Sequence, residues 1–220
     1  MGKVSIETPS ITAGDNALRG LRVALTRDPD LVGLPGQLQS NVQPDGTFCL
    51  PIVGPGDYRM YVPPLLNTFQ WGTTNLPQPL QNSYVKSIRF GSADVLTEGI
   101  HLSVAPREQI EVIIGNGAKL DGTVVNEKKE PVVNATVALV PTTMRRRIDL
   151  YRSTTTDTRG RYKLQGVPPG SYRVFAWEDV ERDAWQDPDF LKVIESRGAT
   201  IQVSEGGQMT EDLLVIPSTR

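Results

Sequence analysis

The chain has 220 residues, including 20 glycines and 17 prolines, and its 23 basic and 25 acidic side chains give a formal net charge of −2. This balance excludes the basic excess typical of nucleic-acid-binding proteins, and no apolar run approaches the roughly 18 residues of a membrane-spanning helix. The single cysteine, Cys49, excludes an internal disulfide. The opening segment MGKVSIETPS lacks the apolar core of a secretion signal, so an exported protein would be represented here by a mature or excised piece.

The first half of the chain shows the period-two alternation of half-buried strands. Leu21, Val23 and Leu25, for example, share one face of a predicted strand. The segment Pro63 to Ser83 contains four prolines and is expected to form an irregular cover over an edge or end of the sheets. The predicted strands are Lys3–Thr8, Ala17–Arg27, three within Gln37–Val62, Val85–Phe90, Ile100–Val104 and Ile110–Ile114.

The second half centres on Arg152 to Ala176, which predicts three strands joined by two tight turns. Gly160 permits the first reversal because glycine accepts a positive φ, and Pro168-Pro169-Gly170 forms the second. Alternation predicts that Tyr162, Leu164, Tyr172, Val174 and Ala176 face inward, whereas Lys163, Arg173 and Phe175 face outward. The other strands predicted here are Lys119–Asn126, Val132–Val140, Ile201–Val203 and Leu213–Ile216.

A short helix is predicted after the acidic and aromatic connection that follows Trp177. Asp187 is a suitable N-cap, Pro188 suits the first helical position, and Asp189 favours the positive N-terminal end. Gly198 is the expected C-terminal stop. The predicted apolar stripe of this helix consists of Phe190, Leu191, Val193 and Ile194.

The two halves repeat one plan. A shift of 114 positions places QPDGTFCLPIVGPGDYRMYV, which starts at Gln43, on DTRGRYKLQGVPPGSYRVFA without a gap. Turn residues and inward-facing positions are the ones that repeat, so the shared feature is a folding plan. The sequence therefore predicts an all-β chain of two domains, residues 1–116 and 117–220, each of typical domain length.

The segments GTVVNEKKEPVVNATVALVP and TDTRGRYKLQGVPPGSYRVFAWE resemble the carboxypeptidase regulatory-like domain. The resemblance covers Leu120 to Ile216, and its extension AWEDVERDAWQDPDFLKVIESRG is similar to versions in large exported acidobacterial proteins. The first half resembles the family more loosely, through D-G-x-F and G-P-G-D-Y. The resemblance implies a seven-stranded prealbumin-like (transthyretin-like, Ig-like) β-sandwich in each half. It also implies a non-catalytic accessory module of a secreted, periplasmic or surface protein; related folds serve as carbohydrate-binding modules and adhesin stalks, and fold alone does not choose among these.

Two surfaces are candidates for contact with a ligand or partner. In the first, Trp177, Glu178, Asp179, Trp185 and Asp187 belong to one acidic and aromatic segment. The tryptophans either form a platform that stacks on sugar rings or grips a partner, with acids binding hydroxyls or Ca²⁺, or they seal the end of the sandwich under solvated acids. We expect the sealing arrangement to be the more common outcome.

The second candidate surface is the run Arg145, Arg146 and Arg147, near Arg152. Three adjacent arginines are suited to an anionic polymer or an acidic protein face, although such runs are more often solvated loops. An acidic segment and a basic loop on one chain also permit head-to-tail self-association. Open sheet edges offer a further route, because an edge strand can recruit a strand from a neighbour.

No catalytic or metal site is predicted. The only histidine, His101, alternates with Ile100 and Leu102 and is expected to face solvent, and Cys49 is expected on an outer strand face. One histidine and one cysteine are too few ligands for a zinc site, and no cofactor motif is present.

The sequence therefore predicts a non-enzymatic module of an exported bacterial protein, at the cell surface, in the extracellular space or in the periplasm. It would act in assembly through protein contacts, either by self-association or with neighbouring domains. The alternative is a carbohydrate-binding module that uses Trp177 and Trp185.

Overall fold

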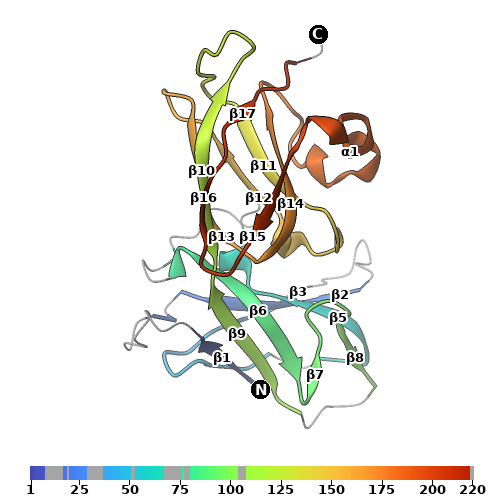
Figure 1. Cartoon of the computed structure of the whole chain (residues 1–220). Coiled ribbons are helices and arrows are strands. Elements are labelled where there is room, and N and C mark those ends of the chain that lie inside the picture. The colour runs from blue at the N-terminus through green and yellow to red at the C-terminus, as the bar shows by residue number, and fades with distance from the viewer. Residues whose placement is uncertain are drawn as a thin grey trace. The chain divides into compact units, whose positions relative to one another are not determined.

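The chain consists almost entirely of β-strands and divides into two compact units, Met1–Asn116 and Gly117–Arg220. The computed structural model describes residues 1–7, 17–18, 20–28, 37–50, 53–66, 76, 80–103 and 108–218. Figure 1 shows the strands of each unit, with one short α-helix in the second. The predicted all-β class is therefore confirmed, and each unit is described separately below.

The first unit has two sheets that enclose one apolar core. One sheet has the order β4-β1-β9-β6-β7, and the other β3-β2-β5-β8. The bounds are β1 Gly2–Ile6, β2 Arg22–Arg27, β3 Gln37–Asn41, β4 Thr47–Phe48, β5 Gly56–Tyr61, β6 Ser83–Phe90, β7 Ala93–Asp94, β8 Ile100–Leu102 and β9 Ile110–Asn116, with a 3₁₀ turn η1 at Pro63–Leu65. Leu21, Val23 and Leu25 are buried in this core, as their alternation predicts. Much of the predicted cover, Pro63 to Ser83, lies outside the described residues.

The second unit is also a two-layer sandwich. One layer has the order β13-β10-β16, with β17 pairing further along β10, and the other β12-β11-β14-β15. The bounds are β10 Ala118–Val125, β11 Thr136–Pro141, β12 Arg152–Thr155, β13 Arg161–Val167, β14 Gly170–Trp177, β15 Ala199–Val203, β16 Gln208–Thr210 and β17 Leu213–Leu214. The helical elements are η4 Ile148–Leu150, η5 Ala184–Gln186, α1 Pro188–Ile194 and η6 Glu195–Arg197.

The two units share a strand order. β3-β2-β5-β8 corresponds to β12-β11-β14-β15, and β4-β1-β9 corresponds to β13-β10-β16. β2 lies 114 positions before β11 at both of its ends, which is the shift that aligns the two halves of the sequence. The units differ in one connection, which runs from β5 to β8 in the first unit and from β14 to β15 in the second. There the first unit carries β6 and β7, with β6 added antiparallel to β9, whereas the second carries η5, α1 and η6.

The turn glycine of each unit packs against the first strand of that unit. Gly160 has φ +71°, and a Cβ there would lie 2.9 Å from the carbonyl oxygen of Val124. Gly46 has φ +85°, and its Cβ would lie 2.4 Å from the carbonyl oxygen of Val4. Any other residue would clash as well as strain the backbone, so both turns require glycine.

A tyrosine fixes the second turn of each repeat. The hydroxyl of Tyr172 donates to the carbonyl of Pro168 at 3.0 Å, and that of Tyr58 donates to the carbonyl of Gly54 at 2.9 Å. Both tyrosines are buried. We expect Tyr172→Phe and Tyr58→Phe each to lower the free energy of unfolding by about 1 kcal/mol, because a buried carbonyl at Pro168 and a partly buried one at Gly54 lose their donors. Urea unfolding checks this; two variants as stable as the wild type would show that the hydroxyls contribute nothing.

In the first turn of the second repeat, the carboxylate of Asp157 is expected to stabilise the fold at neutral pH and to lose this effect in acid. The carboxylate of Asp157 accepts from the backbone N–H groups of Arg161 and Arg159 at 2.9 and 2.8 Å, and these bonds lower its pKa. A carboxylate with a lowered folded-state pKa stabilises the fold above its unfolded pKa of about 3.9, and the contribution is lost as the pH falls below it. We expect Asp157→Asn to flatten the loss of stability between about pH 5 and pH 2. Urea midpoints across this range measure the effect, with Asp179→Asn as the charge-matched control; identical slopes for wild type and Asp157→Asn would contradict it.

Candidate functional site

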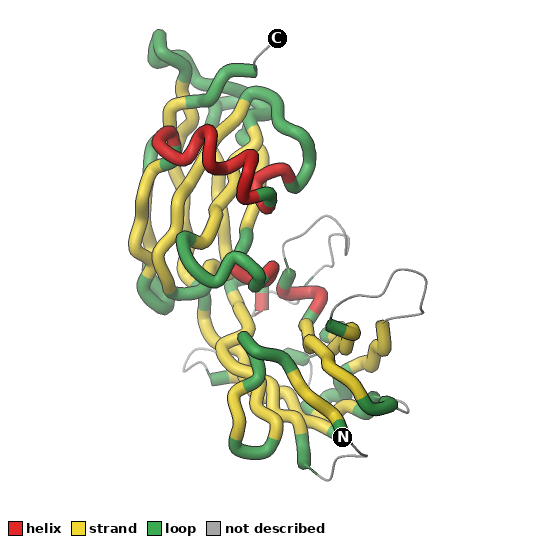
Figure 2. Tube along the Cα trace, turned by 90° about the vertical axis from the view of Figure 1, so that its right-hand side faces the viewer, coloured by secondary structure: helices red, strands yellow, loops and turns green. Residues whose placement is uncertain are grey.

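The segment between β14 and β15, residues 178–198, is the candidate site, and we call it the insert. It contains η5, α1 and η6, and Figure 2 shows its helices lying over one face of the strands of the second unit. α1 begins as predicted. Asp187 is its N-cap and accepts from the backbone N–H of Asp189 at 2.8 Å, and Pro188 occupies the first turn.

Both candidate tryptophans are buried. Trp177, the last residue of β14, and Trp185, in η5, are each only 3% exposed. Their ring centroids lie 6.1 Å apart with an interplanar angle of 24°, and Trp177 also stacks on Phe175 at 5.3 Å. Phe190 of α1 lies 6.2 Å from Trp177. The ring faces are therefore occupied by one another and by neighbouring aromatic side chains, which is the sealing arrangement.

The insert and the outer face of its sheet form a second apolar cluster, separate from the sandwich interior. Its buried members are Ala138, Val140, Tyr151, Phe175, Trp177, Trp185, Leu191 and Ile216. Alternation alone predicted that Phe175 faces outward, and it does, but the insert covers it. Phe190 and Ile194 are partly buried against this cluster. Val193 is 84% exposed, so its predicted place in the apolar stripe is wrong, since the α1 surface that carries it faces solvent.

The acidic residues of the insert lie on its surface. The exposed acids are Glu178, Asp179, Glu181, Asp187, Asp189 and Glu195. The backbone N–H of Glu178 donates to the carbonyl of Ile216, and its carboxylate accepts from the backbone N–H of Ser218 at 3.3 Å. Asp183, partly buried, adopts a left-handed conformation with φ +63° at the start of η5. In the part of the chain that the structure describes, no three or more His, Cys, Asp or Glu residues are grouped so as to hold a metal ion.

The arginine run does not act as one basic patch. Arg145 pairs with Glu195 of η6 at 3.4 Å, and Arg147 pairs with Asp149 through two hydrogen bonds of 3.1 and 2.5 Å. Arg146 is exposed. Arg173 of β14 also approaches Glu195, at 3.8 Å, and donates to its backbone carbonyl at 2.7 Å. Two of the three arginines are thus engaged within the unit, and Arg145 with Arg173 fastens the end of the insert to the sheet.

The recess beside this charged group is not a ligand pocket. Its lining includes the apolar side chains Val140, Phe175 and Leu191 and the charged side chains Arg145, Arg173 and Glu195. It is too narrow to admit a water molecule. Its side chains therefore serve packing and attachment of the insert.

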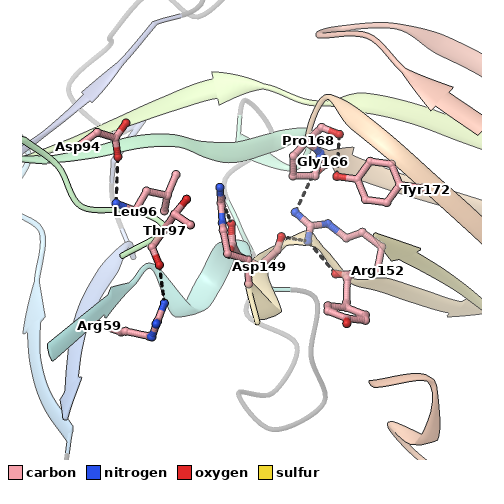
Figure 3. A network of polar contacts seen from close by, with 11 residues as sticks. Arg59, Asp94, Leu96, Thr97, Asp149, Arg152, Gly166, Pro168 and Tyr172 are labelled. Atoms are coloured by element: carbon pink, nitrogen blue, oxygen red, sulfur yellow. Dashed lines mark hydrogen bonds and ion pairs between the residues drawn. The ribbon is translucent and has the colours of Figure 1, made fainter. Parts of the chain in front are cut away.

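Sequence reasoning missed a buried arginine. Arg152 is 2% exposed, and its guanidinium donates to the backbone carbonyls of Asp149, Tyr151 and Gly166 at 2.7, 2.9 and 2.6 Å. Figure 3 shows the side chain pointing from β12 toward Gly166 of β13. Burial lowers the pKa of Arg152, and the charge of Asp149 opposes that shift. This contact joins an edge strand of each layer; only its position beside the arginine run hinted at a role.

The other residues considered for chemistry lie in the first unit, at its surface. His101 of β8 faces Asp57 of β5 across the sheet, with Nδ1 and Oδ1 2.5 Å apart, and both side chains are exposed. Cys49 is exposed, as expected. Among the described residues, no helix is both long and apolar enough to cross a bilayer.

The fold and the insert define the second unit as a two-layer β-sandwich with one covered outer face. Residues 119–204 match the family model of the carboxypeptidase regulatory-like domain, which confirms the resemblance for this unit. A search of curated proteins finds no match.

Solved structures with similar chains include two pilins. One is the minor pilin of Streptococcus agalactiae, with 11% identity, 100% of this chain and 98% of that chain covered, and a TM-score of 0.34. The other is a shaft pilin of Lactobacillus rhamnosus GG, with 14% identity, 99% and 96% coverage and a TM-score of 0.32. The 5-hydroxyisourate hydrolase of Klebsiella pneumoniae has 14% identity, 46% and 87% coverage and a TM-score of 0.27.

Proposed function

We propose that this chain is a non-catalytic accessory module of an exported bacterial protein that acts in surface or extracellular assembly through protein contacts. One observation carries the proposal: the insert covers Trp177 and turns Trp185 inward, whereas most of its acids are exposed. The surface that distinguishes the second unit from the first is therefore charged and polar. It suits a protein partner with a cationic face, because exposed charges steer association and select partners.

The alternative of a carbohydrate-binding module requires an aromatic face that a sugar ring can reach. Trp177 and Trp185 lack such a face, because they stack on each other and lie in the cluster beneath α1. Sugar binding through this pair would require the insert to lift away from the sheet. Arg145 and Arg173 oppose such movement through their contacts with Glu195.

Head-to-tail association through the arginine run is not the preferred form of this contact. Arg145 and Arg147 already have carboxylate partners within the unit, so only Arg146 remains as an exposed member of the run. The acidic surface of the insert is better matched by a cationic face elsewhere, on a neighbouring domain or another protein of the same assembly.

Tryptophan emission of the purified chain tests this function, and it is expected to stay constant when soluble polysaccharides are added. Because Trp177 and Trp185 lie in the apolar cluster between the insert and its sheet, any sugar bound there would change their emission. A saturable emission change with a polysaccharide, lost in Asp179→Ala, would replace this proposal with the carbohydrate-binding alternative.

A further inference from the structure

Four charged residues form one row across the outer face of the five-stranded sheet of the first unit. The row crosses β1, β9, β6 and β7, which are neighbours in the order β4-β1-β9-β6-β7 (Figure 1). Its members, which we call the charge row, are Lys3, Glu111, Arg89 and Asp94. We infer that the charge row docks against the charge row of a second copy; the inference rests on the proposed function and names one partner and one surface for it.

The strand register places these four residues on one line. Lys3 of β1 pairs with Glu111 of β9. Arg89 of β6 pairs with Glu111 on one side and with Asp94 of β7 on the other. Residues directly opposite each other in neighbouring strands share a face of the sheet, and all four residues are exposed. Positive and negative charges therefore alternate across the sheet at the strand spacing of about 4.8 Å.

The charges of the row are available to a partner. In the part of the chain that the structure describes, Lys3, Glu111 and Arg89 form no ion pair. Asp94 accepts one hydrogen bond, from the backbone N–H of Leu96 at 3.0 Å, and keeps its charge (Figure 3). Exposed charges of this kind contribute little to the stability of their own sheet.

The second unit forms its sandwich without such a row. Lys3 lies opposite Thr47, and Thr123 lies opposite Arg161, which follows Thr47 by 114 positions. Thr123 is therefore the equivalent of Lys3, and it carries no charge. The strands at the other end of the row, β6 and β7, have no counterpart among the described residues of the second unit, where η5, α1 and η6 occupy that connection. The row is thus not a requirement of the fold.

The alternation of signs selects the kind of partner. Because the positive and negative charges of the row balance, the row favours neither a polyanion nor a polycation. A matching partner must present alternating charges at the spacing of neighbouring β-strands, which is a property of another sheet face. The charge row of a second copy meets this condition.

Two copies match when a twofold axis runs parallel to the strands, between β9 and β6. This axis reverses the order of the row in the second copy. Lys3 of one copy then faces Asp94 of the other, and Glu111 faces Arg89, so every contact joins opposite charges. A shift by one strand would set like charges against each other, which fixes the register. The contact is isologous and stops at two copies, and it is weak and sensitive to salt because its charges are exposed.

Sedimentation velocity of the full chain in low salt tests the inference, with Glu111→Lys and Arg89→Glu as the disrupting variants. Each variant sets like charges against each other at both symmetry-related contacts of the dimer. We expect each to raise the dimer dissociation constant about tenfold or more. Glu127→Lys makes the same charge change at an exposed position of the second unit and is expected to dimerise like the wild type. Circular dichroism verifies that all of these variants fold.

An equimolar mixture of the two disrupting variants separates docking from a role within the sheet. In a mixed dimer the introduced lysine of one copy faces the introduced glutamate of the other. Arg89 of the first copy likewise faces Glu111 of the second, so every contact again joins opposite charges. We expect the mixed dimer to recover wild-type affinity. Mixing leaves the pairs within each chain unchanged, so a row that only stabilises its own sheet predicts no recovery.

The outcomes that overturn this inference leave the proposed function intact. Docking through the charge row is wrong if the chain stays monomeric up to about 1 mM, if neither variant weakens the dimer, or if the mixture does not recover. Contacts with other proteins of the assembly remain in place in each case. The proposed function itself fails only with the saturable, Asp179-dependent polysaccharide response described above.

Discussion

Replacing Arg152 with methionine is expected to lower the free energy of unfolding of the second unit by about 3 kcal/mol. Methionine fills much of the same volume, so the loss reports the hydrogen bonds and not a cavity. The backbone carbonyls of Asp149, Tyr151 and Gly166 would each lose a charged donor in a buried site. Urea unfolding followed by tryptophan emission measures the effect, since Trp177 and Trp185 both belong to this unit.

Two further variants define the cause. Arg159→Met removes the same charge from an exposed turn and is expected to change stability by less than about 0.5 kcal/mol. Arg152→Lys keeps the charge but lacks the planar fork that reaches both strands, so we expect it to recover only part of the loss. An Arg152→Met protein as stable as the wild type would show that the carbonyls find other partners, and that Arg152 does not lock this side of the sandwich.

Replacing Trp185 with alanine is expected to cost about 3–5 kcal/mol, the range for removal of a large aromatic side chain from a packed core. Trp185 is the contact through which η5 packs on Trp177, and it fills the space between the insert and the outer face of β14. The loss should appear first in the insert, because the sandwich interior forms a separate cluster. Hydrogen exchange of residues 178–198, together with urea unfolding, measures both parts.

Val193→Ala is the matched control, since it shortens an apolar side chain on the same insert at an exposed position. We expect it to change stability by less than about 0.5 kcal/mol. If Trp185→Ala were as mild as Val193→Ala, the tryptophan would not be a core residue, and a platform open to ligands would again be the better account of this segment.

Much of the sandwich follows from local sequence pattern. Tyr162, Leu164, Tyr172 and Val174 are buried in the interior of the second unit, as period-two alternation predicts. Gly160 and Gly170 have positive φ angles at the two predicted turns, and Asp187 caps α1 as predicted. These features depend on a residue and its near neighbours, which is why sequence reasoning reaches them.

Local sequence pattern did not decide the arrangement of the candidate site. The composition of the acidic and aromatic segment that begins at Trp177 offered two arrangements for Trp177 and Trp185, an exposed platform and a sealed end, and nothing in the spacing decides between them. The run of three arginines is likewise one basic feature in the sequence, but in the structure Arg145 pairs with Glu195, fifty positions later, and Arg147 pairs with Asp149, two positions later.

The sequence by itself determined the all-β class, the two turns of the second repeat, the inward faces of β13 and β14 and the start of the short helix, because alternation and turn chemistry are local. Only the tertiary structure decided that the outer face of β14 is covered, that both tryptophans are core residues and that Arg152 is buried between two strand edges. The physical reason is that burial depends on which segments pack over a face of the sheet. The residues next to a side chain in the sequence do not indicate which distant segment will cover it.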